Sequence, residues 1–230
     1  MKPFNPFAIL YPVASVFFLL TVNCLHSQAV HLECDSDAVG NISQLGEVDE
    51  FTFDANQGDY VIVRLVGGSS AFDPSLTLQD PDGMAIQTVT SFGAVVRISQ
   101  VLNTSGTFKL LAKEKDDNAT GQYGISLQIL KPECAGQISC RGTAAGNITS
   151  LAGMQAYSFS LEDTTSVILR MIGSSSTFDN RFELYRLGNP VSLIESDETF
   201  GEVARLENGL NLLPGDYMVV CMEKDGNATG

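Results

Sequence analysis

The sequence predicts an all-β protein built from two tandem antiparallel β-sandwich domains of a jelly-roll-like kind. Short stretches in which apolar and polar residues alternate are separated by turns rich in glycine and proline, as is typical of half-buried strands. No apolar stripe with the helical period accompanies them. The whole pattern then recurs about 106 residues further along the chain. A unit of that length is as large as a domain, so the recurrence predicts tandem domains rather than a solenoid of short repeats.

Residues 1–29 are predicted to be a secretory signal peptide. Lys2 supplies the positive start, residues 7–22 form an apolar run, and small residues stand at positions −3 and −1 of a cleavage site after Ala29. An uncleaved anchor helix is the alternative, because the run is nearly long enough to span a bilayer. Lipidation at Cys24 fits less well, since no small residue precedes it. We therefore expect export to the extracellular space, the cell surface or the periplasm, with no membrane insertion after cleavage.

The first domain is expected to cover residues 30–133. Its turns contain glycine, and one of them has the hairpin sequence Asp-Pro-Asp-Gly. Seven or eight half-buried strands in roughly 100 residues are typical of a sandwich or jelly roll. The expected strands lie around residues 51–53, 61–65, 76–78, 96–98, 108–110 and 123–129.

The second domain is expected to cover residues 134–230 and to lack its last strand. Its start repeats the first domain, because Gly-Asn-Ile-Thr-Ser-Leu at 146–151 matches Gly-Asn-Ile-Ser-Gln-Leu at 40–45. Further along, the offset grows from 106 to 109, and Gly230 then corresponds to Gly121. A sandwich without its last strand exposes a sheet edge and an apolar stripe. We therefore expect the chain to be a fragment of a longer polypeptide that continues beyond its C-terminus.

Four cysteines remain after the predicted cleavage, and in an oxidising compartment they favour disulfides over a zinc site. A bridge between Cys34 and Cys134 would join the two ends of the first domain, and it is the preferred pairing. A bridge between Cys134 and Cys140 is the local alternative. Cys140 corresponds to Cys34 in the repeat, and Cys221 could substitute for the partner that it lacks.

The order of the elements resembles that of the bacterial pre-peptidase C-terminal (PPC) domain. The residues that carry the resemblance are Asp-Glu-Phe-Thr-Phe at 49–53, Gly-Asp-Tyr-Val-Ile-Val at 58–63, the segment at 73–83 that ends in Asp-Pro-Asp-Gly, Gly-Thr-Phe at 106–108 and Gly-Gln-Tyr at 121–123. The resemblance covers residues 40–130 well and 146–230 less well. In the second copy, Arg-Leu-Gly-Asn-Pro at 186–190 replaces the Asp-Pro-Asp-Gly turn.

The resemblance implies a jelly-roll-like β-sandwich that is appended to secreted enzymes, often peptidases, or strung along surface proteins. Such modules are non-catalytic, and they serve in secretion, anchoring or the binding of an extracellular polymer such as collagen or polysaccharide. We therefore expect a non-catalytic secreted binding or attachment module whose partner is an extracellular polysaccharide or protein polymer. The alternative is a secretion or targeting appendage of an exported peptidase or other hydrolase whose catalytic domain lies outside these residues.

The composition argues against an enzyme. The chain has two histidines, of which His26 would leave with the signal peptide and His31 would lie at the new N-terminus, so a Ser-His-Asp or Cys-His set is not expected. A pair of acidic residues, as in glycoside hydrolases, stays open, although the chain has no tryptophan to stack on a sugar ring. The formal net charge of −14 argues against nucleic acid as a partner. No cofactor is expected.

Calcium is the one metal that the sequence allows. Asp73, Asp80 and Asp82 form the densest set of oxygen ligands, the type that calcium prefers. The segment at 80–83 lacks the further ligands of an EF-hand loop, and its sequence is that of an ordinary turn. The turn is therefore the favoured interpretation, with a calcium site as the alternative.

Two arginines occupy matching positions inside apolar strands. Arg64 and Arg170 are followed in their copies by Phe72-Asp73 and Phe178-Asp179. Each could face a ligand, or could point outward and pair with the aspartate of a neighbouring strand, and the second interpretation is favoured. Sequons for N-glycosylation, which are otherwise simply loop sequences, start at Asn41, Asn103, Asn118, Asn147 and Asn227.

Overall fold

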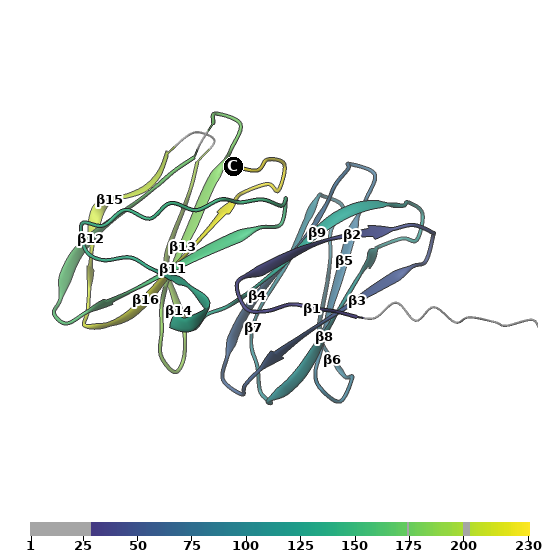
Figure 1. Ribbon diagram of the computed structural model, residues 1–230, viewed down its shortest axis with the longest axis horizontal. Coiled ribbons are helices and arrows are strands. Elements are labelled where there is room, and N and C mark those ends of the chain that lie inside the picture. The colour runs from purple at the N-terminus through teal and green to yellow at the C-terminus, as the bar shows by residue number, and fades with distance from the viewer. Residues whose placement is uncertain (1–28, 174, 200–202) are drawn as a thin grey trace, which may run out of the picture.

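The computed structural model describes residues 29–173, 175–199 and 203–230, so the predicted signal peptide lies almost wholly outside the described residues. The described chain is all-β, as predicted, and it forms two sandwiches placed along one long axis (Figure 1). We call the described residues up to 133 the first sandwich and those from 134 the second sandwich. Within these ranges no helix is both long and apolar enough to cross a membrane.

The first sandwich consists of a five-stranded and a four-stranded sheet. The five-stranded sheet has the order β1 (Val30–His31), β3 (Val48–Ala55), β8 (Gly106–Glu114), β5 (Pro74–Gln79) and β6 (Ala85–Thr90). The four-stranded sheet has the order β2 (Ser36–Ile42), β9 (Gly121–Ile129), β4 (Tyr60–Gly67) and β7 (Val95–Val101). All neighbours are antiparallel except β1 and β3.

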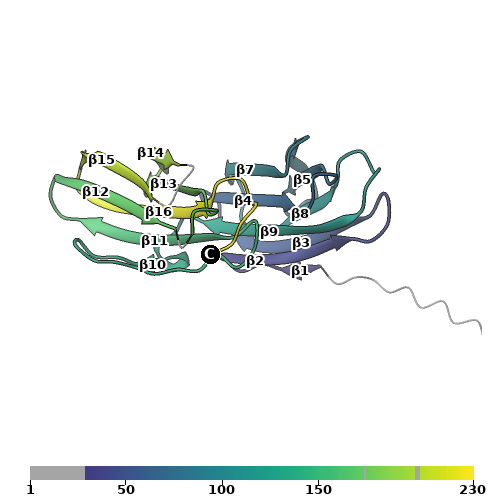
Figure 2. The same ribbon diagram turned by 90° about the horizontal axis from the view of Figure 1, so that it is seen from above.

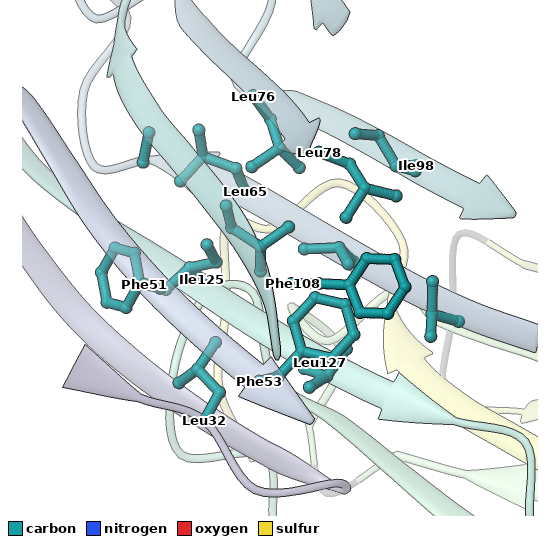
Figure 3. Packing of buried hydrophobic residues seen from close by; sticks show 14 of the residues in the cluster. Leu32, Phe51, Phe53, Leu65, Leu76, Leu78, Ile98, Phe108, Ile125 and Leu127 are labelled. Atoms are coloured by element: carbon teal, nitrogen blue, oxygen red, sulfur yellow. The ribbon is translucent and has the colours of Figure 1, made fainter. Parts of the chain in front are cut away.

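The inner faces of these two sheets form one apolar core. Figure 3 shows Phe53 and Phe108 of the five-stranded sheet meeting Leu127 of the four-stranded sheet, all three fully or almost fully buried. The rings of Phe53 and Phe108 are stacked, with centroids 5.4 Å apart. Burial of each such side chain contributes about 1.5–3 kcal/mol. The alternating apolar residues of the sequence therefore build the core that they predicted.

The second sandwich repeats the five-stranded sheet but has a smaller opposing sheet. The larger sheet has the order β10 (Gly136–Gln137), β11 (Met154–Leu161), β16 (Gly215–Glu223), β13 (Asn180–Arg186) and β14 (Ser192–Glu198). The smaller one pairs β12 (Thr165–Ile172) with β15 (Val203–Leu212). The parallel pair β10–β11 has the register of β1–β3 shifted by 106 residues, since Gly136 faces Tyr157 as Val30 faces Phe51. These two parallel strand pairs therefore have the same register in the two sandwiches.

The predicted disulfide between Cys34 and Cys134 is present, with Cα atoms 5.5 Å apart. Strand β9 runs antiparallel to β2, so the chain after β9, where the 3-10 turn η1 (Pro132–Cys134) lies, returns to the chain before β2. This pairing makes the alternative Cys134–Cys140 bridge wrong. Cys140 and Cys221 carry free thiols, so Cys221 does not substitute for the missing partner.

Two strands depart from the expected half-buried pattern. In β4, every residue from Val61 to Gly67 is buried, and in β9 every residue from Tyr123 to Ile129 is buried. A strand buried on both faces has a nearly continuous apolar run, as Val61–Leu65 has around its one arginine. The second face of this sheet is covered by the second sandwich, which lies directly against it (Figure 2).

Candidate functional site

An apolar contact joins the two sandwiches. Tyr60, Ile62 and Leu130 of the first sandwich contact side chains of β11, β13 and β16, and the rings of Tyr60 and Tyr185 lie 5.8 Å apart. We call this contact the inter-sandwich interface. Its fully or almost fully buried members are Ile62, Leu130, Ala156, Tyr185, Met218, Val220 and Met222. Because both sheets contribute central strands, the interface fixes the two sandwiches in one orientation.

A buried ion pair lies within this interface. Arg97 of β7 donates two hydrogen bonds to the carboxylate of Glu183 on β13, one of them from Nη2 to Oε2 at 2.6 Å. Glu183 also accepts hydrogen bonds from the Tyr185 hydroxyl and from Arg181. Its side chain is 2% exposed. A charge buried this deeply is stable only when it is paired and fully hydrogen-bonded, so the network ties the two sandwiches together.

The network changes the ionisation of Glu183. Burial by itself raises the pKa of this carboxyl, but the hydrogen bonds and charge of Arg97, with hydrogen bonds from Tyr185 and Arg181, outweigh it and lower the pKa to about 2. Burial lowers the pKa of the Arg97 guanidinium, but the hydrogen bonds and charge of Glu183, together with Tyr185, outweigh it and raise the pKa overall. The pair is therefore charged at neutral pH.

Acid is expected to weaken the interface in a defined range. Because the pKa of Glu183 is lowered on folding from 4.5 to about 2, the carboxylate stabilises the fold fully above pH 4.5 and loses that contribution as the pH falls toward 2. Urea unfolding of the parent chain and of Glu183→Gln at several pH values measures this. The stability difference between the two should shrink from pH 5 to pH 2, and a constant difference would contradict the assignment.

The two matching arginines have different environments. Arg64 is 2% exposed and donates from Nη2 to the backbone carbonyls of Glu223 and Lys224, at 2.9 and 3.4 Å. Burial, followed by the charge of Arg97, lowers the pKa of Arg64 to about 10. Arg170 lies exposed on β12. Arg64 is thus neither directed at an open ligand site nor paired with Asp73, because it holds the C-terminal end of β16 in the interface.

The three aspartates proposed for calcium are not brought together. Asp73 precedes the six-residue strand β5 and Asp80 follows it, which separates the two by roughly 20 Å. Asp80 Oδ1 accepts hydrogen bonds from the backbone N–H groups of Asp82 and Met84, at 3.1 and 2.7 Å, as expected for an Asp in a turn. The residues that the structure describes contain no cluster of three or more His, Cys, Asp or Glu side chains suited to a metal.

His31 lies on the surface at the start of the first sheet. Its Nδ1 is 3.1 Å from the Thr52 hydroxyl and its Nε2 is 4.0 Å from an Asp54 carboxylate oxygen. His31 and Asp54 are exposed and Thr52 is half-buried. The asparagines of the five sequons are likewise all exposed.

A cavity of about 370 Å³ opens where the two sandwiches meet. We call it the junction groove. It is lined by Gly67, Gly68, Ser69, Ser70, Phe72, Phe92, Gly93 and Ala94 of the first sandwich and by Leu151, Gly226 and Asn227 of the second. Sites for ligands are common at such boundaries between folded units.

Four of the residues that line the junction groove are glycines. A Cβ atom on Gly67 would lie 2.8 Å from the Phe72 carbonyl oxygen, and one on Gly226 would lie 2.4 Å from a Val66 methyl group. Gly226 also has a φ of 68°, which favours glycine. These two positions therefore require glycine, because a side chain would not fit between the packed segments that line the groove.

One aromatic ring stands at the rim of the junction groove. Phe92 is 81% exposed, and Lys115 Nζ lies 3.6 Å from the centroid of its ring. This cation–π contact orients the ring on one face and leaves the rest open to solvent. A large exposed aromatic next to a groove is a common anchor for a binding partner.

Sequence reasoning missed three of these residues, namely Arg97, Glu183 and Phe92. A signal existed for Glu183, because a carboxylate between Phe182 and Leu184 in a buried strand needs a cationic partner. No comparable local signal marks Phe92, which is one of thirteen phenylalanines.

No family model matches the sequence, and no curated protein matches it. Several solved structures are similar to parts of the chain. The pre-peptidase C-terminal domain of a collagenase from Bacillus anthracis is 14% identical, with 44% of this chain and 95% of that chain covered and a TM-score of 0.39. PliG from Salmonella Typhimurium, a periplasmic inhibitor of g-type lysozyme, is 21% identical over 44% of this chain and 97% of that chain, with a TM-score of 0.34. CorA, a surface-associated copper-binding protein of Methylomicrobium album BG8, is 7% identical over 44% of this chain and 97% of that chain, with a TM-score of 0.31.

Proposed function

We propose that the chain is a non-catalytic secreted attachment module that binds an extracellular polysaccharide or protein polymer in the junction groove. The observation that carries this proposal is a groove that combines the exposed polar side chains of Ser69, Ser70 and Asn227 with the exposed ring of Phe92 at its rim. An extended polymer can lie along such a groove, form hydrogen bonds with these side chains, and cover the ring.

The rigid interface supports the same proposal. The junction groove has walls from both sandwiches, so its shape depends on their fixed relative position. The ion pair of Arg97 with Glu183 and the buried Arg64 hold that position without a flexible linker. A preformed groove loses less conformational freedom on binding than a flexible one, and this favours affinity.

The net charge restricts the polymer. At −14, the chain repels strongly anionic polymers and favours neutral or basic ones. Fibrillar collagen, chitin and cellulose fit this condition better than nucleic acid does.

The organisation that we propose is a signal peptide at 1–29 followed by tandem modules of the pre-peptidase C-terminal kind at 30–133 and 134–230. The order of the sequence motifs, the matching registers of β1–β3 and β10–β11, and the disulfide of Cys34 with Cys134 support it. If the chain is an appendage of an exported hydrolase, the same groove would hold that enzyme on its substrate polymer.

Replacement of Phe92 by alanine is expected to weaken polymer binding by about tenfold or more, because an aromatic anchor of this kind commonly contributes over 1 kcal/mol. The measurement is retention of the purified chain on insoluble collagen, chitin, cellulose and peptidoglycan. Met84→Ala is the matched control, since Met84 is 68% exposed on the hairpin between β5 and β6 and lies outside the groove. Equal retention of both variants, or failure of the parent chain on every polymer, would contradict the proposal.

A further inference from the structure

The second sandwich contains an open strand position along one edge of β12. In the first sandwich, β4 lies between β9 and β7, whereas its counterpart β12 pairs with β15 alone among the described residues. Residues 142–148, which correspond to β2, form no strand. We call the space between β12 and residues 142–148 the strand slot. A cavity of about 960 Å³ occupies it, lined in part by β12.

The strand slot is apolar on its inner side. Val61, Val63 and Leu65 of β4 are completely buried, while their counterparts on β12 are only half-buried. The difference arises because β9 supplies four inward side chains to the first core, and nothing described takes their place in the second. These half-buried apolar counterparts on β12 are Val167, Leu169 and Met171. Phe159, Phe178 and Phe182 also line the cavity.

The backbone around Gly230 already has the register of the absent strand. The N–H group of Ile148 donates to the Gly230 carbonyl at 2.7 Å, and the N–H group of Gly230 donates to the Ile148 carbonyl at 3.0 Å. In the first sandwich, the corresponding Ile42 and Gly121 are the first pair of the β2–β9 ladder. Gly230 therefore stands at the entrance of the slot, in the position from which a strand would run between residues 142–148 and β12.

A free thiol lies beside the slot. Cys140 is exposed and lines the same cavity, and it corresponds to Cys34. Cys34 is bonded to Cys134, which follows Gly121 by thirteen residues. The second sandwich thus holds one half of the bridge that closes the first.

We propose that the strand slot is filled by one antiparallel β-strand formed by polypeptide directly continuous with Gly230, and that Cys140 forms a disulfide with a cysteine about thirteen residues further on. By the pattern of β9, the second, fourth, sixth and eighth residues after Gly230 are apolar and face the core. The first of them is aromatic and lies on Phe178, as Tyr123 lies on Phe72 at a centroid distance of 5.9 Å.

The disulfide requires an oxidant, which we take to be a disulfide of the glutathione class. The Cys140 thiolate attacks oxidised glutathione and releases one reduced glutathione, and the second cysteine then displaces the other from the mixed disulfide. Two protein thiols lose two protons and two electrons in total. The oxidised glutathione takes up both electrons and leaves as two thiols.

The test adds a copy of residues 122–134 directly after Gly230, in glutathione redox buffer. We expect peptide mapping to find Cys140 linked to the added cysteine, and the melting midpoint to rise by about 10 °C. The amides of β12 should exchange at least tenfold more slowly than in the chain without the addition. None of these readouts depends on polymer binding, so they separate this proposal from the proposed function.

A second extended chain carries one extra serine between Gly230 and the added segment. This shift by one residue turns the apolar side chains of the added strand to the outer face, so it should give neither protection of β12 nor the rise in melting midpoint. A free Cys140 with unchanged exchange of β12 in the first extended chain would overturn the proposal. Equal behaviour of the two extended chains would also overturn it. So would dimerisation of the chain without the addition, if the β12 amides already exchange slowly in that dimer, because a second copy would then fill the slot.

Discussion

Replacement of Arg97 by alanine is expected to lower the free energy of unfolding by about 3–5 kcal/mol, among the largest effects of any single substitution in this chain. The cause is the carboxylate of Glu183, whose side chain is 2% exposed and would be left buried without its bidentate partner. Arg181 and Tyr185 would remain as hydrogen-bond donors, but neither provides the paired geometry of Arg97.

A double-mutant cycle in urea unfolding measures this contribution. Arg97→Met and Glu183→Leu should each be strongly destabilising alone, whereas the double variant should recover much of the loss, because it leaves no unpaired buried charge. Lys109→Ala is the matched control. Lys109 pairs with Glu50 at 3.0 Å on the surface, both side chains are well exposed, and its loss should cost about 0–1 kcal/mol.

Scattering in solution provides a second readout of the same variants. If the ion pair fixes the orientation of the sandwiches, Arg97→Met should lengthen or broaden the particle before either sandwich unfolds, and Lys109→Ala should not. Additive effects in the cycle, together with an unchanged particle shape, would show that the pair makes no specific contribution to the interface.

The strands could be predicted from the sequence because each depends on its own residues. The alternation of Val61, Val63 and Leu65 predicted β4, and the same pattern predicted the core of the first sandwich. The disulfide followed from the repeat, which places Cys34 and Cys134 at opposite ends of one copy. These features arise from local patterning and from the comparison of the chain with itself.

The interface could not be predicted in this way. Arg64 donates to the carbonyl of Glu223, which lies 159 residues further along the chain, and no periodicity near Arg64 records that contact. The burial of Ile62 on the second face of β4 likewise depends on side chains from β13 and β16. For the aspartates, proximity in sequence suggested proximity in space, but the extended strand β5 separates Asp73 from Asp80.

Replacement of Cys34 by serine is expected to destabilise the first sandwich by about 4–5 kcal/mol. The bridge to Cys134 spans 100 residues. In the loop-entropy model, a cross-link that closes so long a loop greatly reduces the conformational entropy of the unfolded chain. Cys134 is buried in the core of the first sandwich, so the substitution also leaves a thiol where a bonded sulfur was packed.

Cys140→Ser is the matched control for this variant, because Cys140 has the same place in the repeat but is exposed and unbonded. Its effect should stay within about 0.5 kcal/mol, as for other surface substitutions. Urea unfolding without reductant should separate the two variants clearly, and with reductant the parent chain should approach Cys34→Ser. If the parent chain unfolds at the same urea concentration with and without reductant, the disulfide does not stabilise the first sandwich. If Cys34→Ser instead destabilises only the first sandwich, the interface transmits little of that loss to the second sandwich. The fixed orientation of the two sandwiches then depends on the ion pair of Arg97 and Glu183 rather than on the disulfide.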